Sequence, residues 1–172
     1  SWLLLFYQII KIFHCGKISH SKKLNKSNSN IYSSVEMEML SWLETCFNKS
    51  FEKDGGKIIS FQKDLKDGIV IYGALAAYIP ALKNSIANLK IPVMSNEDIQ
   101  YNLERVFAAF YEYGIPNHLT LSELVYAGPQ DIATLISELY QILPLYVSKL
   151  PNLVFSCILG EIVSKSIELS NN

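Results

Sequence analysis

Apolar residues recur every three to four positions through most of the chain between residues 35 and 143, which is the spacing of one face of an α-helix. Segments with this pattern lie at 35–47, 65–79, 99–110, 121–125 and 132–143. Residues 57–61 offer the only stretch that a strand would explain equally well, and they lie between helical segments. The pattern therefore predicts an all-α body with four longer helices and one short one.

Residues that start and stop helices agree with these segments. Ser95 precedes the third segment, and Asp98 follows it at the spacing of a capping box. Thr120 and Glu123 repeat this spacing before the short segment, and Pro129 suits the first turn of the last one. Helix ends are predicted where glycine or proline interrupts the pattern: at Pro80, at Gly114 with Pro116, and at Pro144 with Pro151.

Two further apolar segments flank this body. Residues 2–13 are the most apolar run of the chain, but they number twelve and include a glutamine and a lysine, whereas about 18–20 residues span a bilayer. We expect no membrane span and predict a short packed helix over 1–14, with an interfacial or signal-like segment as the open alternative. An amphipathic C-terminal helix is predicted over 151–172. Because the chain begins at Ser1 rather than Met, we expect a fragment or a processed form.

Between the first apolar segment and the body, the composition changes to serine, asparagine and lysine. Residues 15–34 show neither a helical nor a strand period. We predict a flexible linker at 15–34 and assign the folded domain to 35–150.

Charge is distributed as unevenly as composition. The formal net charge is −1, from 15 basic and 16 acidic residues. Residues 1–34 hold five lysines and no acid, giving +5, so residues 35–172 hold 10 basic and 16 acidic residues, giving −6. An acidic body does not favour nucleic acid as a partner. The candidate electrostatic contact is the basic segment 17–26, which a solvated arm or a nuclear signal explains as well, and its lysines are Lys17, Lys22, Lys23 and Lys26.

Residue types that carry catalysis or bind metals are sparse and scattered. The cysteines Cys15, Cys46 and Cys157 include no CxxC pair, which predicts reduced, buried thiols rather than disulfides or a zinc site. None of the three histidines has a carboxylate or cysteine at ligand spacing, and His118 is expected to be solvated or locally bonded in a loop. Neither a glycine-rich phosphate loop nor a serine elbow occurs. The sequence therefore predicts no enzyme, no metal and no cofactor.

Three stretches carry a family resemblance when they are read in order. The first helix contains Leu40-Ser41-Trp42-Leu43, the second segment opens on Asp64-Leu65-Lys66-Asp67-Gly68, and the third is followed by Tyr113-Gly114-Ile115-Pro116. Their order, with the helices between them, resembles the calponin homology domain over about residues 35–149. The family motif positions, which we expect to be structural, are Trp42, Asp64, Leu65, Asp67, Gly68, Pro80, Gly114 and Pro116.

The resemblance implies a calponin homology fold, a compact bundle of four main helices plus short helices, to which the two terminal helices are additions. Leu65 and Ile69 are expected to face the core and Trp42 to pack into it. Asp64 is expected to cap the start of the second helix. Asp64 and Asp67 also look like an acid–base pair, but the start of a helix explains both carboxylates without catalysis.

The same resemblance implies protein partners. Family members bind F-actin, microtubules or scaffold proteins, and the actin-binding ones usually carry two such domains in tandem. Here there is one, and its first helix carries Glu36, Glu38 and Glu44, which would repel acidic F-actin. A lone copy flanked by apolar helices resembles the one in large cilia- and flagella-associated proteins.

We therefore expect a non-catalytic interaction or structural module of a larger cytoskeletal protein. Its expected location is the cytoplasm and cytoskeleton, and specifically the axoneme of a cilium or flagellum. The alternative is direct binding to actin or microtubules, aided by the basic segment. Neither the partner nor the oligomeric state follows from the sequence.

Overall fold

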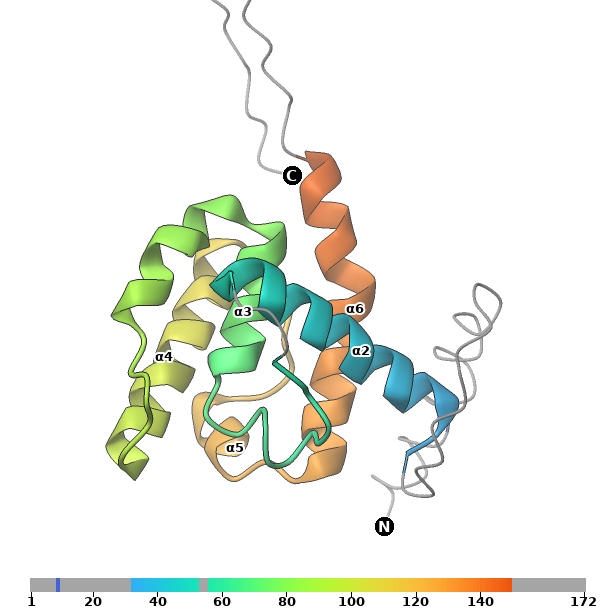
Figure 1. The fold of residues 1–172 in the computed structure, drawn as a ribbon, viewed down its shortest axis with the longest axis horizontal. Helices are drawn as coiled ribbons and strands as arrows, with labels where there is room; N and C mark the ends of the chain where they lie inside the picture. The colour runs from blue at the N-terminus through green and yellow to red at the C-terminus, as the bar shows by residue number, and fades with distance from the viewer. Residues whose placement is uncertain (1–8, 10–31, 53–55, 150–172) are drawn as a thin grey trace, which may run out of the picture.

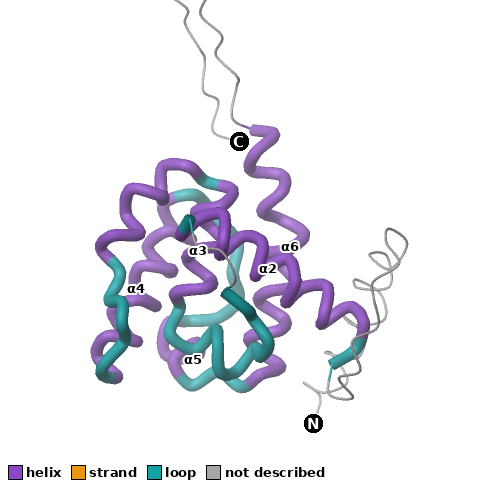
Figure 2. Tube along the Cα trace, viewed as in Figure 1, coloured by secondary structure: helices purple, strands orange, loops and turns teal. Residues whose placement is uncertain are grey.

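The computed structural model of the chain describes residues 32–52 and 56–149, together with Ile9. Its elements are α2 (Ser34–Phe51), α3 (Ile69–Tyr78), the 3-10 helix η2 (Pro80–Asn88), α4 (Asn96–Glu112), α5 (Leu121–Val125) and α6 (Pro129–Lys149). The described residues contain no strand, and loops join the helices (Figure 2). The all-α prediction is confirmed.

The predicted terminal segments fall largely outside this description. The helix expected over 1–14, the helix expected over 151–172 and most of the linker expected over 15–34 stay predictions. The last two residues of that linker are corrected, because Ser33 is the N-cap of α2 and Ser34 its first residue. Ser33 and Glu36 form a capping box. Their spacing was a local signal that our sequence analysis missed.

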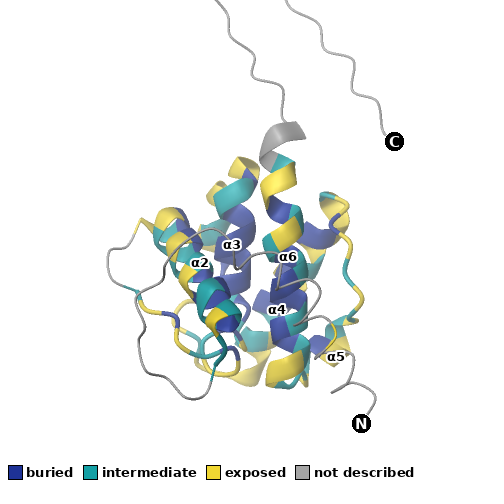
Figure 3. Ribbon diagram, turned by 90° about the vertical axis from the view of Figure 1, so that its right-hand side faces the viewer, coloured by how far each residue is buried: buried dark blue, intermediate teal, exposed yellow. Residues whose placement is uncertain are grey.

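Helix α3 lies among the other helices of the bundle (Figure 1). All its residues from Val70 to Ala76 are buried, so this stretch has no exposed face (Figure 3). We predicted an apolar stripe here, whereas a helix that is apolar on every side is typical of a core element. The stripes of the longer helices share the same core, with buried residues that include Met39, Leu40, Leu43, Leu103, Val106, Phe110, Ile132, Leu135, Ile136, Leu139 and Leu143.

The second predicted helix begins later than its apolar spacing indicated. We predicted a helix from 65 to 79, but Leu65 lies in a series of turns and α3 begins only at Ile69. Gly68 separates the two parts because its φ of 76° lies in the left-handed region. Leu65 nevertheless reaches the core, with 1% of its surface exposed. Pro80 follows the end of α3, as predicted, and is the first residue of η2.

The predicted starts of the later helices are confirmed. Ser95 with Asp98 forms a capping box at α4, and Thr120 with Glu123 forms one at α5. In each box the hydroxyl accepts a hydrogen bond from the backbone of the acidic residue, whose carboxylate accepts one in return. Pro129 is the first residue of α6.

Of the two predicted stops beyond η2, the one at Gly114 with Pro116 is confirmed. Pro144 does not end its helix, and Pro151 lies outside the described residues. α4 ends before Gly114, whose φ of 61° allows the Ile115 N–H to reach the Phe110 carbonyl at 2.8 Å. This is a Schellman end, and it is followed by Pro116. By contrast, α6 continues through Pro144 to Lys149. A proline removes one backbone donor. Here Leu143 before it is fully buried, and after it the Tyr146 hydroxyl donates to the Gly114 carbonyl at 3.0 Å, so contacts hold the helix on both sides of the proline.

Candidate protein-interaction site

The basic segment 17–26 cannot be placed, because its residues lie outside the described part of the chain. Lys17, Lys22, Lys23 and Lys26 therefore stay predicted contacts. The eight family motif positions are all described, and they fall into two groups. One group shapes the start of α3, and the other joins helices or ends them.

Asp64 and Asp67 each bind backbone amides around the turns before α3. Asp64 Oδ2 accepts hydrogen bonds from the amides of Ile59 and Ser60 at 2.8 and 2.9 Å. Asp67 Oδ1 accepts one from Ile69 at 3.0 Å. Asp67 therefore binds the first amide of α3 from the position before the N-cap Gly68, where no side-chain cap is present, and the prediction that Asp64 caps this helix is wrong. Burial raises the pKa of Asp67 from its usual value, while the Ile69 amide opposes that rise.

Gly68 is needed for two separate reasons. Its φ of 76° is one that residues with a Cβ rarely adopt. In addition, a Cβ at this position would lie 3.0 Å from Leu103 Cδ2 and 3.4 Å from the backbone carbon of Asn102. The turn before α3 therefore packs directly on α4, and glycine makes this contact possible.

Trp42 lies at a joint between three helices. Its indole Nε1 donates a hydrogen bond to the Tyr78 hydroxyl of α3 at 2.9 Å. Its ring meets that of Tyr140 of α6 edge-on at a centroid distance of 5.1 Å. Trp42 is only partly buried, so the expectation of a core side chain holds for its contacts but not for its full surface. This aromatic joint (Trp42, Tyr78 and Tyr140) connects α2, α3 and α6.

The acidic residues of α2 are all engaged in hydrogen bonds. Glu36 caps the helix at Ser33, Glu38 accepts from the Tyr140 hydroxyl at 3.3 Å, and Glu44 accepts from the Ile58 amide at 3.2 Å. Glu38 and Glu44 have no Lys or Arg partner within ion-pair distance in the described part of the chain. Their charges are therefore not neutralised by an ion pair within the described residues.

Asn102 is a structural residue that the sequence analysis missed. Its side chain is fully buried in α4. There its Oδ1 accepts from the Lys90 amide at 2.8 Å and its Nδ2 donates to the Lys90 carbonyl at 3.1 Å. Both ends of this buried amide are thus satisfied by one residue of the η2–α4 loop. No local spacing signals such a contact, because the partners are twelve positions apart.

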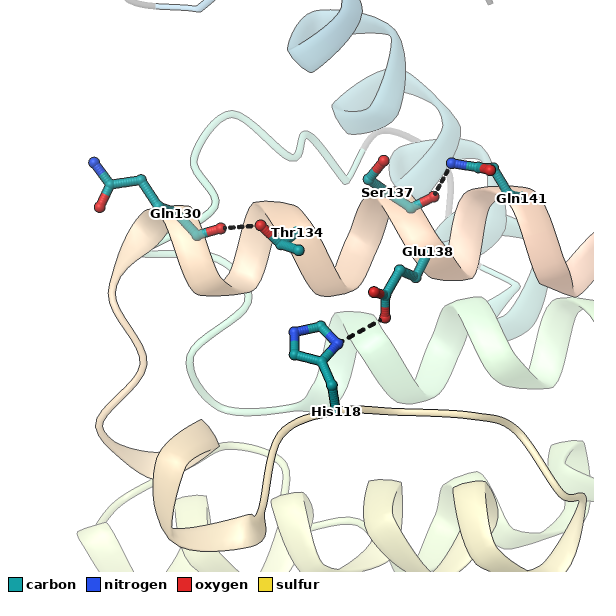
Figure 4. Close-up of polar contacts among 6 residues, drawn as sticks. All are labelled: His118, Gln130, Thr134, Ser137, Glu138 and Gln141. Atoms are coloured by element: carbon teal, nitrogen blue, oxygen red, sulfur yellow. Dashed lines mark hydrogen bonds and ion pairs between the residues drawn. The ribbon is translucent and has the colours of Figure 1, made fainter. Parts of the chain in front are cut away.

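His118 contacts a carboxylate that is distant in sequence. Its Nδ1 lies 3.0 Å from Glu138 Oε2 of α6, and Figure 4 shows the ring directed at that carboxylate. Thr134 and Gln141, drawn beside it, bond instead to carbonyls one turn earlier on α6. This polar contact between two exposed side chains links the 115–120 loop to α6.

Within residues 32–52 and 56–149, His, Cys, Asp and Glu side chains form no group of three suited to hold a metal ion. No helix in this part of the chain is both long and apolar enough to cross a membrane.

The family model of the calponin homology (CH) domain matches residues 33–144, from the N-cap of α2 into α6. The chain belongs to this family.

Two relatives align with nearly the whole chain, beyond the residues that the family model matches. The mouse protein "Cilia and flagella-associated protein 47" is 30% identical over 197 aligned positions, which cover 99% of this chain. The human "Cilia- and flagella-associated protein 47" is 27% identical over 199 positions, which cover the whole chain. In both cases the chain spans 6% of the relative's length. No solved structure matches the chain.

Membership of the CH family indicates a general class of function for this domain. The family indicates a module for cytoskeletal protein interactions, and the family and its ciliary relatives indicate a structural rather than an enzymatic class. The resemblance inferred from the sequence is therefore confirmed.

Proposed function

We propose that this CH domain is a non-catalytic interaction and structural module of a larger protein of the ciliary or flagellar axoneme. One observation carries the non-catalytic part: Asp64 and Asp67, the motif's only paired carboxylates, both bind backbone amides that shape the start of α3. The ciliary location is supported by the names of the two relatives, each of which aligns with nearly the whole chain.

The domain proper begins at the N-cap Ser33 rather than at 35 and extends to the predicted boundary at 150. The segments 1–14 and 151–172 are helices that pack on it or on a neighbouring part of the same protein. Its partners are proteins of the cytoskeleton rather than nucleic acid. The carboxylates of α2 and the excess of acidic residues in the body disfavour direct contact with acidic filaments, because like charges slow and weaken association. Any direct filament binding would therefore depend on the basic segment 17–26.

Co-sedimentation tests this proposal. The 1–172 chain is mixed with F-actin and, separately, with microtubules, at low and at moderate salt. We expect little pelleting, and we expect the small amount seen at low salt to vanish at moderate salt, since exposed charges are screened.

Two variants with the same change in charge test whether any filament binding depends on the basic segment. One variant replaces Lys17, Lys22, Lys23 and Lys26 with glutamine, and the other replaces four lysines of the folded domain, Lys57, Lys63, Lys66 and Lys83. Strong pelleting at moderate salt that is lost only in the first variant would overturn the module proposal and establish a filament binder driven by the basic segment.

A further inference from the structure

Two cations lie over one aromatic ring on the outer face of α4. Lys90 Nζ is 5.2 Å from the centroid of the Tyr101 ring, and Arg105 Cζ is also 5.2 Å from it. Arg105 in addition donates hydrogen bonds to the Tyr101 hydroxyl from Nη2 at 2.9 Å and from Nε at 3.3 Å. Contacts of this kind hold a guanidinium in a fixed orientation while leaving it charged.

Neither cation is neutralised. No carboxylate of the described residues lies within ion-pair distance of Lys90 or Arg105, and both side chains are exposed. Asp98 and Glu104 lie on the same helix, but Asp98 accepts from the amides of Met94 and Ser95 and Glu104 accepts from Gln100. In a body with an excess of acids, the Lys–Arg pair on one ring is therefore a small positively charged spot. Arg105 is also the only arginine in the chain.

The loop that carries Lys90 is fixed at both ends. Asn102 binds the amide and the carbonyl of Lys90, and Asp98 Oδ2 accepts from the amide of Met94 at 3.0 Å. Between these anchors the loop runs beside the first turns of α4 (Figure 1). Two of its apolar side chains are exposed. Ile91 is 45% and Met94 83% exposed. A loop already fixed in place loses little conformational entropy when a partner binds.

We propose that Lys90, Ile91, Met94, Tyr101 and Arg105 form a docking surface for an acidic segment of a partner protein that also carries an apolar residue. This inference rests on the proposed function as an interaction module and names the chemistry of its partner. Carboxylates of the partner meet Lys90 and Arg105, and its apolar side chain packs on Ile91 and Met94. Tyrosine, arginine and methionine are residue types that protein interfaces favour.

The positive charges of Lys90 and Arg105 favour an acidic partner. Lys90 and Arg105 differ from the other exposed lysines of the described residues because both lie over one ring, in the same surface stretch as the exposed Ile91 and Met94. A segment with carboxylates and an apolar residue is therefore favoured here. The overall excess of acidic residues in the body also disfavours an anionic membrane.

The test is a titration of the 15N-labelled 1–172 chain with a synthetic peptide of alternating glutamate and leucine, followed by NMR. Shift changes are expected to concentrate at Lys90–Met94 and Tyr101–Arg105. The double variant K90E/R105E should bind about tenfold more weakly, because two exposed ion pairs are lost. The matched control K57E/K63E carries the same change in charge at exposed lysines and should bind as the original chain does.

Three results would overturn the docking surface: shift changes spread over the whole domain, equal weakening by both double variants, or no peptide binding. Preferential binding to phosphatidylserine vesicles would replace it with a lipid surface, and self-association that Lys90→Glu abolishes would replace it with a second copy of the chain. Co-sedimentation with filaments through the basic segment would contradict the proposed function alone, because it leaves the peptide titration unchanged.

Discussion

At the scale of single residues, Asp67 and Gly68 set the start of α3 through two different backbone requirements. Asp67 accepts the Ile69 amide, and Gly68 adopts the left-handed conformation that ends the preceding turns. Gly114 adopts the same kind of conformation at the end of α4. The two glycines differ in their surroundings, since a Cβ at Gly68 would contact α4, whereas one at Gly114 would meet nothing within 4 Å.

This difference predicts unequal costs for alanine. Gly68→Ala should lower the free energy of unfolding by about 2–4 kcal/mol, because left-handed strain and a 3.0 Å approach to Leu103 add together. Gly114→Ala should lower it by about 1–2 kcal/mol, from the strain alone. Urea denaturation of both variants measures the difference, and equal losses would show that the contact with Leu103 relaxes freely.

Cys46 illustrates how burial sets the chemistry of one side chain. Desolvation raises the pKa of its thiol to about 11, against smaller opposing effects of a Tyr78 hydrogen bond and the Lys49 charge. The folded state therefore favours the protonated thiol. Because the folded pKa is raised, this contribution to stability is complete below the unfolded pKa, near 8.5, and is lost as the pH rises through about 11.

We predict that Cys46 resists alkylation in the folded chain. At pH 8 its reaction with iodoacetamide should be roughly 100-fold or more slower than in the urea-unfolded chain, because the thiolate is the reactive species. Mass spectrometry of the peptide that contains Cys46 measures the two rates. Similar rates would mean that α2 opens readily around this residue.

At the scale of elements, helices α2 and α3 approach closely at their small residues. Ser50 Oγ donates to the Gly73 carbonyl at 2.7 Å, and a Cβ on Gly73 would lie 2.9 Å from Phe51 Cε2. The η2–α4 loop is attached in another way, through the buried amide of Asn102. The contact between α2 and α3 requires that Gly73 has no side chain. The loop, by contrast, is held by the side chain of Asn102, which hydrogen-bonds to the backbone of Lys90.

Asn102→Ala should release the loop without unfolding the bundle. The Lys90 amide and carbonyl lose their partner, which should cost about 1–3 kcal/mol of unfolding free energy. Hydrogen exchange at the Lys90 amide should accelerate more than exchange in α3. Ser122→Ala, on the exposed face of α5, serves as the control; loss of protection throughout α3 would show that Asn102 supports the core instead of the loop.

Local sequence patterns predicted some helix boundaries correctly and others wrongly. Apolar spacing located the helices, and two capping boxes located the starts of α4 and α5. The same spacing placed Leu65 in a helix that begins only at Ile69, because a stripe of apolar residues does not reveal a left-handed glycine within it. Pro144 was taken as a stop because the cost of a proline is local, whereas the packing that retains the last turns of α6 is not.

At the scale of the whole molecule, the aromatic joint connects helices from both ends of the described chain. Trp42 and Tyr78 are 36 positions apart, and Tyr140 and Glu38 are 102 apart. The joint thus closes the bundle between α2 and α6. Tyr111, by contrast, is a large aromatic residue with 93% of its surface exposed.

Removing the joint should destabilise the whole bundle. Trp42→Ala should lower the free energy of unfolding by about 2–4 kcal/mol, below the range for a fully buried tryptophan because Trp42 is partly exposed. Tyr111→Ala is the matched control and should change it by less than about 0.5 kcal/mol. Thermal denaturation followed by far-ultraviolet circular dichroism reports both, and similar midpoints for the two variants would contradict the role of the joint.

The sequence by itself determined the helical class, the family, the starts of α4, α5 and α6 and the uneven charge, because each depends on spacings of a few residues or on composition. Only the tertiary structure decided which partners distant residues meet: Asn102 with Lys90, Trp42 with Tyr78, and the two cations with Tyr101. Such contacts depend on how helices cross and on which side chains fill the core. Periodicity along the chain carries no information about either, since it specifies a face of a helix and not the element that covers it.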